Sequence, residues 1–223
     1  MALRLTNIDN LTRPDHSYLR ESDICYHLHE YTKGLTYKES KTNGLIFNLK
    51  IKPHLKADRP DRWKWKLRDI ETVAKEFAST LEPAWLKGAT LVPIPPSKSV
   101  SNPDYDDRMT KVLEAIGKHA GIKCDVRELI IQVVDKEPTH TKDELRDVGL
   151  IKADYRINES LSNPPPKVIG IFDDVLTTGA HFRAAESLLS DRFPGAAIAG
   201  FFIARRVIPE VEFDLSGFTQ VDS

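Results

Sequence analysis

The chain has 223 residues, 40% of them hydrophobic, which is enough for one large α/β domain with a sizeable core. The formal net charge is −1 at pH 7, so the overall charge does not favour a polyanionic partner such as nucleic acid. Cys25 and Cys124 are far apart and form no Cys-x-x-Cys motif, which argues against a disulfide framework and against a cysteine zinc site.

The first 22 residues are polar and irregular, and we expect them to lie along the surface. They lack the apolar core of a signal peptide, and no apolar run in the chain is long enough to span a membrane. These observations predict a cytoplasmic protein that does not contact a membrane.

Two segments with strand-like patterns follow, at residues 24–31 and 44–51, and we expect them to pair as a β-hairpin. Cys25, His27 and His29 would share one face of the first strand, where a metal site is an alternative to a purely structural role. The structural role is favoured because a fourth ligand with a recognisable spacing is missing.

A helix is predicted from about residue 63 to residue 81, because apolar residues recur there at steps of three and four: Trp63, Leu67, Ile70, Ala74, Phe77 and Leu81. The start of this segment interleaves tryptophans with lysines and arginines, a pattern also typical of proteins that bind single-stranded nucleic acid. The structural interpretation is favoured, although Lys64, Lys66 and Arg68 would remain available to an anion.

A short strand at residues 90–94 runs into a proline-rich loop at residues 95–99. Next, Met109, Val112, Leu113, Ile116 and Ala120 form the apolar stripe of a helix that ends at Gly121. Residues 126–134 read as a strand or a connection to one. Residues 135–144 are polar and contain a proline, so we expect a mobile loop.

The most informative segment is residues 167–182. An apolar run predicts a buried parallel strand, which ends in Asp173 and Asp174 and is followed by Thr177, Thr178, Gly179 and a helix. Hydroxyl groups, free backbone N–H groups and the positive end of the helix dipole meet in this loop and predict a phosphate site. A further buried strand follows at residues 195–204. Arg205 and Arg206 end that strand, and we expect them at the surface, with binding of an anion as the alternative.

The two aspartates must face a part of the ligand other than its phosphate, because a carboxylate beside a phosphate repels it. Ribose hydroxyls donate hydrogen bonds to carboxylates, and Mg²⁺ also binds carboxylates. A ribose 5-phosphate therefore fits the segment. Walker B segments and receiver domains also carry two acids after an apolar strand. The chain has no Gly-x-x-x-x-Gly-Lys-Ser/Thr motif, and a receiver domain does not need Thr-Thr-Gly.

The order apolar strand, two acids, apolar pair and Thr-Thr-Gly resembles the 5-phosphoribosyl-1-pyrophosphate (PRPP) motif of type I phosphoribosyltransferases. Residues 91–206, with their Val-Pro-x-Pro segment, resemble the ComF family in particular. Asp104–Arg108 stands where ComF proteins carry an Arg-Gly-aromatic-Asn-Gln run, and the N-terminal zinc cysteines of many ComF proteins are missing. The phosphate loop also differs, with Ala180 in place of a second glycine and His181 in place of a small hydroxyl residue.

The resemblance implies a type I phosphoribosyltransferase fold: an α/β protein with a central, mostly parallel sheet flanked by helices, an N-terminal β-hairpin and helix elaboration, and a flexible hood. We accordingly expect residues 1–89 to form the elaboration, packed on a phosphoribosyltransferase-like core at residues 90–223. The hood falls near residues 135–146, where a solvated loop without a role in the site is an equal alternative.

The resemblance also implies transfer of a phosphoribosyl group from PRPP to an unknown acceptor, in nucleotide metabolism, with Mg²⁺ as cofactor. The implied catalytic residues are Asp173 and Asp174, which would also be the protein's ligands to Mg²⁺ if it has any beyond the bound pyrophosphate. The implied binding residues are, for ribose and the 5-phosphate, Asp173, Asp174, Val175, Leu176, Thr177, Thr178, Gly179, Ala180 and His181; for pyrophosphate, Pro95, Pro96, Ser97, Lys98 and Arg108; and in the hood, His140, Lys142 and Arg146.

A second function stays open, in which the fold binds PRPP or a nucleoside monophosphate without turnover and regulates a protein partner. For a ComF-type protein, that partner would act in DNA uptake or DNA processing. A homodimer is compatible with either function, and direct binding of nucleic acid is the least favoured alternative.

Overall fold

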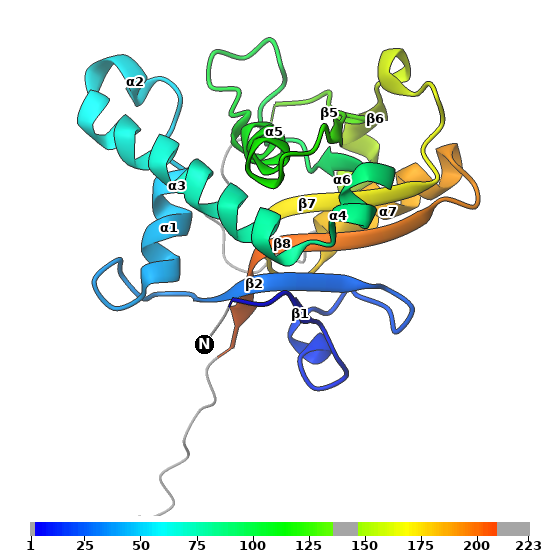
Figure 1. The fold of residues 1–223 in the computed structure, drawn as a ribbon, viewed down its shortest axis with the longest axis horizontal. Coiled ribbons are helices and arrows are strands. Elements are labelled where there is room, and N and C mark those ends of the chain that lie inside the picture. The colour runs from blue at the N-terminus through cyan, green and yellow to red at the C-terminus, as the bar shows by residue number, and fades with distance from the viewer. Residues whose placement is uncertain (1–2, 136–146, 209–223) are drawn as a thin grey trace, which may run out of the picture.

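A six-stranded sheet with the strand order β1-β2-β8-β7-β3-β4 forms the centre of the computed structural model, which describes residues 3–135 and 147–208 (Figure 1). Strand β1 is antiparallel to β2, and the other four pairings in this sheet are parallel. The strands are β1 Thr6–Asn7, β2 Cys25–Thr32, β3 Thr90–Pro93, β4 Asp125–Val126, β7 Val168–Leu176 and β8 Ala197–Val207. The expectation of an α/β protein with a mostly parallel central sheet is confirmed.

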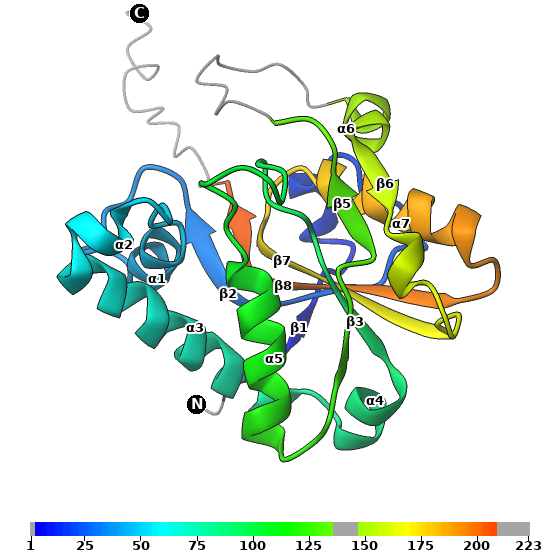
Figure 2. The same ribbon diagram turned by 90° about the horizontal axis from the view of Figure 1, so that it is seen from above.

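Helices cover both faces of this sheet (Figure 2). One face carries α1 Lys41–Leu49, α2 Leu55–Asp58, α3 Pro60–Thr80, α4 Pro83–Gly88 and α5 Arg108–Ala120. The other carries α6 Val148–Asp154, α7 Ala180–Arg192 and a small antiparallel sheet of β5 Ile130–Gln132 and β6 Tyr155–Ile157. Two 3₁₀ turns lie at Arg13–Asp15 and Glu159–Leu161.

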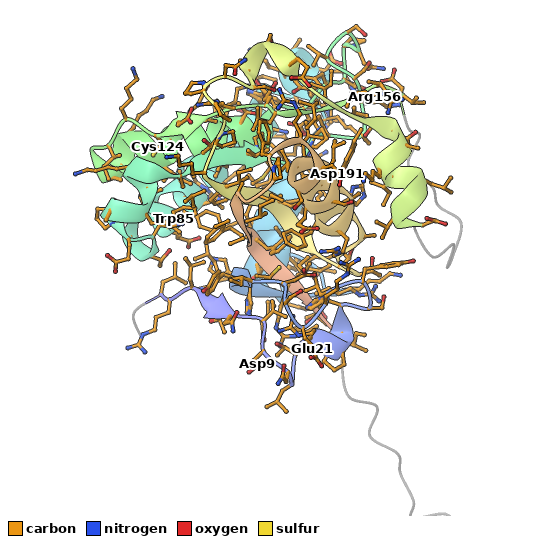
Figure 3. The ribbon with its side chains drawn as sticks, turned by 90° about the vertical axis from the view of Figure 1, so that its right-hand side faces the viewer. Asp9, Glu21, Trp85, Cys124, Arg156 and Asp191 are labelled. Atoms are coloured by element: carbon orange, nitrogen blue, oxygen red, sulfur yellow. The ribbon has the colours of Figure 1, made fainter. Side chains whose placement is uncertain are left out.

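Aromatic side chains fill the core between α3, α4 and the sheet. The ring of Phe172 stacks on Phe201 at 4.9 Å between centroids and meets Phe77 edge-on at 5.3 Å. Trp85 of α4, labelled in Figure 3, lies 4.8 Å from Phe201 and packs over Gly170, where an added Cβ would lie 2.7 Å from the indole. Close contact between α4 and β7 therefore requires glycine at position 170.

The predicted strand at residues 44–51 is wrong, and so is the hairpin with residues 24–31. Residues 41–49 form α1, which begins where the Ser40 side chain accepts a hydrogen bond from the N–H of Asn43. Ile46 and Leu49 are buried one helical turn apart, as in a helix. The apolar alternation of Leu45, Phe47, Leu49 and Ile51 in the same segment favours a strand, and in so short a segment the two patterns are hard to tell apart. The predicted strand at 24–31 is confirmed as β2, which pairs with β8 inside the central sheet.

The predicted helix at 63–81 is confirmed as α3, but its buried stripe was partly wrong. Ile70, Ala74 and Phe77 are buried as expected, whereas Leu67 is 46% exposed. Lys66, which is 1% exposed, takes the place of Leu67 in the interior. Its ammonium donates to the carbonyl oxygens of Leu49 and Ile51 at 2.8 and 2.7 Å and pairs with Asp106, so its burial is compensated.

The predicted helix that ends at Gly121 is confirmed as α5, and the apolar stripe predicted for it is buried. Gly121 has a φ of +65°. Strand β2 brings part of residues 1–89 into the central sheet, and the division of the chain at residue 89 stays a prediction. Among the described residues, no helix combines the length and the apolar character needed to cross a membrane.

Candidate functional site

The predicted phosphate loop lies between β7 and α7. Strand β7 ends at Leu176 and α7 begins at Ala180, so Thr177, Thr178 and Gly179 form the turn. Gly179 has a φ of +84°, no side chain caps the helix, and its first turn holds no acidic residue. The first N–H groups of an α-helix have no partner within the helix, and together with the helix dipole they attract an anion to this point.

The N-terminal segment braces this loop from one side. His16 donates from Nδ1 to the carbonyl oxygen of Thr177 at 2.5 Å, and the N–H of Tyr18 donates to that of Thr178 at 2.9 Å. Leu19 packs on Gly179, where an added Cβ would lie 2.9 Å from Leu19 Cδ2. Burial lowers the pKa of His16, so its ring stays neutral and donates from Nδ1. Through these contacts the carbonyl groups of Thr177 and Thr178 point toward the N-terminal segment.

A buried ion pair ties the N-terminal segment to α7. Arg183 donates from Nη1 to Asp23 at 2.9 Å, and both side chains are more than nine-tenths buried. In Figure 3, the part of the segment that carries Asp9 and Glu21 lies on one side of the sheet, away from Trp85 and Cys124. Sequence reasoning missed this brace because it joins residues about 160 positions apart without any periodic signal.

Asp174 is held by two cations. Arg108 Nη2 donates to Oδ2 at 2.6 Å, and Lys50 Nζ lies 3.1 Å from Oδ1. Burial opposes ionisation of Asp174, but Lys50 and Arg108 outweigh it, and the pKa of Asp174 is lowered. Asp174 is therefore ionised at neutral pH.

Asp173 behaves in the opposite way. Its Oδ1 accepts a hydrogen bond of 2.7 Å from the backbone N–H of Asp174. Burial, and then the charge of Asp174, raise the pKa of Asp173 to about 7. The two neighbouring acids therefore differ in protonation, with one ionised and the other partly protonated near pH 7.

Asp174 belongs to a chain of alternating charges. Lys66 Nζ contacts Asp106 at 2.7 Å, Asp106 accepts from Arg108 Nη1 at 2.7 Å, and Arg108 reaches Asp174 and thus Lys50. These three cations and two anions leave a net charge of +1 when Asp173 is protonated. Arg108 Nε is buried and has no hydrogen-bond partner among the described residues. The chain of charges thus offers a further donor to an anionic ligand.

A cavity of about 40 Å³ lies between Asp173 and the loop after β3. Pro95, Pro96, Arg108 and Asp173 all line it, so the structure brings together these four predicted site residues. Tyr105 lines it as well. The pKa of this phenol is raised by burial and then by Glu128, and the hydroxyl stays protonated.

Two other predicted pyrophosphate residues are not among those that line this cavity. Ser97 is exposed, and Lys98 is buried. The loop around them is held by Asp135, which accepts from the Ser99 N–H at 2.7 Å and from the Asn102 amide at 2.6 Å. The charge of Lys98 helps lower the pKa of Asp135, after the hydrogen bonds from Ser99 and Asn102.

Three of the predicted 5-phosphate residues present no free side chain to a ligand. Val175 and Leu176 are buried in the core. His181 is half-buried, and its Nδ1 lies 2.7 Å from the hydroxyl of the buried Tyr155. These three residues could contribute to phosphate binding through their backbone N–H groups. His181 could also use the ring atoms other than Nδ1.

The predicted hood residues His140, Lys142 and Arg146 lie outside the described residues. The expectation that Arg205 is at the surface is wrong: it is buried and pairs with Glu30 at 2.6 Å and with Asp15 at 3.1 Å. Within residues 3–135 and 147–208, no three histidine, cysteine or acidic side chains gather to hold a metal ion.

The proposed metal role of Cys25, His27 and His29 is not supported by their contacts. Cys25 is fully buried, and burial raises the pKa of its thiol to about 12. His27 Nδ1 donates to the carbonyl oxygen of His29 at 3.0 Å, and His29 Nε2 lies 2.9 Å from Glu76 on α3. The three side chains thus serve separate structural contacts.

Sequence reasoning missed Lys50 and Asp106 as parts of the site. Lys50 follows α1, in a segment that was predicted as a strand, and its contact with Asp174 spans more than 120 residues. Asp106 was part of the acidic-aromatic segment, but nothing in that segment alone distinguishes it from Asp104 or Asp107.

Comparison of the chain with protein-family models and with curated proteins gives no match.

Proposed function

We propose that this protein binds PRPP together with Mg²⁺ at the carboxyl ends of β3 and β7 and transfers the phosphoribosyl group to an acceptor. The α/β sheet would then be a variant of the type I phosphoribosyltransferase fold, close to the ComF family. One observation supports this most: an uncapped helix N-terminus begins six residues after Asp174, the member of the acid pair that is bound to Arg108 and Lys50. The arrangement offers a phosphate site, a diol site and cations within one loop and its neighbours.

The 5-phosphate would bind the loop 177–181. Thr177 and Thr178 are half-buried and bring hydroxyl groups, and the first turn of α7 brings backbone N–H groups. His16 and Tyr18 engage the loop's carbonyl oxygens, which would otherwise repel a phosphate. Binding then requires little rearrangement of the loop.

The ribose hydroxyls would bind at Asp173 and Asp174. As the bond to pyrophosphate breaks, the anomeric carbon gains positive charge, which the ionised Asp174 stabilises. Asp173, with its pKa of about 7, would accept a proton or a hydrogen bond from the substrate close to neutral pH. The protein thereby acts by orientation and by electrostatic stabilisation.

The leaving pyrophosphate would lie toward Pro95, Pro96 and Arg108, which line the cavity beside Asp173. Arg108 brings the unpaired Nε, and Lys50 is half-exposed and free to move from Asp174 toward an anion. Asp174 is already occupied by two cations, so bound Mg²⁺ would be held mainly by the oxygens of the ligand. When bound, Mg²⁺ would neutralise part of the charge of the leaving pyrophosphate.

A second candidate is a binding module that senses PRPP or a nucleoside monophosphate without turnover. It is favoured by one observation: both oxygens of Asp174 are engaged by cations, and this carboxylate is already neutralised. The departures at Ala180 and His181 point the same way, because His181 contacts Tyr155. Under this function the bound ligand would alter contacts with a protein partner in DNA processing.

Calorimetric titration with PRPP and Mg²⁺ tests the binding site. We expect 1:1 binding that ribose 5-phosphate weakens by competition and that Thr178→Val reduces. Thr72→Val is the matched control, because Thr72 is a half-buried threonine on α3, as Thr178 is half-buried, and its hydroxyl donates to the carbonyl oxygen of Arg68. No heat of binding with PRPP, ribose 5-phosphate or nucleoside monophosphates would overturn both candidate functions.

Pyrophosphate release separates the two candidates. The protein is incubated with PRPP, Mg²⁺ and a panel of nucleobases and amines, and pyrophosphate is measured. Release that depends on one acceptor and disappears in Asp174→Asn supports the transferase. Binding of PRPP without release across the whole panel supports the binding module.

A further inference from the structure

The segment from Lys50 to Arg68 concentrates positive charge. It holds eight lysine and arginine residues and two aspartates, which is a net charge of +6 in a chain whose total is −1. The segment runs through α2 and the first half of α3, which with α1 form one corner of the molecule (Figure 1). The rest of the chain is therefore acidic, and this corner is the place where an anionic partner is attracted.

Four cations of this corner are exposed: Lys52, Lys56, Arg59 and Arg62. The ion pairs among the described residues include none of them, in contrast to Lys64, which pairs with Asp61, and to the buried Lys66. No described carboxylate forms an ion pair with any of the four, although the charge of Lys52 also acts on Asp104.

Two large aromatic rings are exposed beside these cations. Phe47 of α1 is 58% exposed and Trp65 of α3 is 49% exposed. A guanidinium group lies over each ring: Arg62 over Phe47 at 5.6 Å and Arg68 over Trp65 at 4.2 Å from the ring centroid. We call the seven residues of this surface the aromatic-basic face: Phe47, Lys52, Lys56, Arg59, Arg62, Trp65 and Arg68.

This face adjoins the candidate site. His54, between α1 and α2, contacts Asp104 in the loop before α5 at 2.7 Å, and Lys50 reaches Asp174. An extended polyanion on the aromatic-basic face would therefore come close to the carboxyl ends of β3 and β7.

We propose that the aromatic-basic face binds single-stranded nucleic acid. Proteins that bind it without sequence preference combine cations that follow the phosphates with aromatic rings on which bases stack, and the face provides both. An acidic protein segment would use the cations but has no need of exposed rings. An anionic membrane would need a continuous apolar stripe, whereas here the rings alternate with cations. The proposal stands apart from the PRPP site, with which it shares no residue.

Fluorescence anisotropy tests this with labelled 20-nucleotide oligo-dT and oligo-U at 50 and 200 mM salt. We expect binding that weakens steeply with salt. The quadruple variant Lys52→Gln, Lys56→Gln, Arg59→Gln and Arg62→Gln should lose at least tenfold in affinity and show a shallower salt dependence. Because these side chains are exposed and outside the described ion pairs, the variant should fold normally, as circular dichroism will check.

Stacking is tested by Phe47→Ala and Trp65→Ala, each expected to weaken oligonucleotide binding by roughly tenfold. The matched control is Lys118→Gln with Lys123→Gln, two exposed lysines near the other end of the sheet, which should leave binding unchanged. Thr178→Val should also leave it unchanged, which separates this proposal from the PRPP site.

Three outcomes would overturn the proposal: no oligonucleotide binding at 50 mM salt, equal loss in the quadruple variant and in the lysine control, or unchanged binding in both aromatic variants. Competition distinguishes other partners. Poly-glutamate or vesicles with anionic lipid that displace the oligonucleotide at equal charge concentration would show that the face attracts anions in general, which also contradicts it.

Discussion

Nη2 of Arg108 lies 2.6 Å from Oδ2 of Asp174, and this contact joins the start of α5 to the end of β7. The same guanidinium donates from Nη1 to Asp106, which also binds the buried Lys66. One side chain therefore connects the acid pair to the interior of the α3–α5 layer. Arg108 holds Asp174 in position and also adds a positive charge to the site.

Replacing Arg108 should destabilise the protein strongly. Arg108→Ala leaves Asp174 and Asp106 buried with fewer partners, and loss of one member of a buried ion pair typically costs about 3–5 kcal/mol of unfolding free energy. Urea denaturation measures it. The control is Arg192→Ala, which breaks an exposed pair with Glu159 and should change the unfolding free energy far less. Similar losses in both variants would contradict the buried network.

Gly179→Ala should be more damaging than Gly195→Ala. Both glycines have positive φ, +84° and +85°, so both variants carry the same backbone strain of roughly 1 kcal/mol. At position 179 the new Cβ would also lie 2.9 Å from Leu19, whereas at position 195 no heavy atom lies within 4 Å. Thermal denaturation should show the larger loss for Gly179→Ala. Equal losses would show that Leu19 does not restrict the phosphate loop.

The stability of the protein should depend on pH through Asp173. Its pKa is raised from 3.8 to about 7, by burial first and then by Asp174, so between pH 4 and pH 7 the folded state keeps a proton that the unfolded chain has lost. The free energy of unfolding from this group therefore falls as pH rises through that window. The lowered pKa of Asp174 acts below about pH 4 and does not interfere.

Asp173→Asn removes this dependence. The difference in unfolding free energy between the variant and the wild type should therefore grow in favour of the variant as pH rises, by about 1–3 kcal/mol from pH 5 to pH 8. Urea denaturation at pH 5, 6, 7 and 8 gives both curves. Parallel curves for the two proteins would mean that Asp173 titrates at its ordinary value in the folded state.

His16→Ala should weaken both the fold and phosphate binding. It leaves the carbonyl oxygen of Thr177 without its buried donor, at a cost of about 1–3 kcal/mol. The loosened loop should then bind ribose 5-phosphate less tightly, which calorimetry measures. The control His119→Ala removes a histidine whose contact with Glu71 lies toward the surface, and should change neither quantity appreciably. A loss of stability without a loss of affinity would limit His16 to a structural role.

The sequence by itself determined the elements whose signals are local. The apolar run of β7, the glycine at 179 and the apolar stripe of α5 up to Gly121 are properties of neighbouring residues, and each predicted element appears in place. The position of Asp173 and Asp174 beside a helix N-terminus followed from the same segment, because strand, turn and helix are consecutive in the chain.

Tertiary structure alone decided what depends on contacts between distant residues. Residues 41–49 are a helix because Ile46 and Leu49 find an apolar partner in α3, although the alternation of Leu45, Phe47 and Leu49 also fits a strand. Lys66 is buried because two carbonyl groups and Asp106 compensate its charge. The groups that compensate the charge of Lys66 lie 15 to 40 positions away in the chain, and His16 lies 161 positions from Thr177. No local pattern in the sequence predicts contacts over such separations.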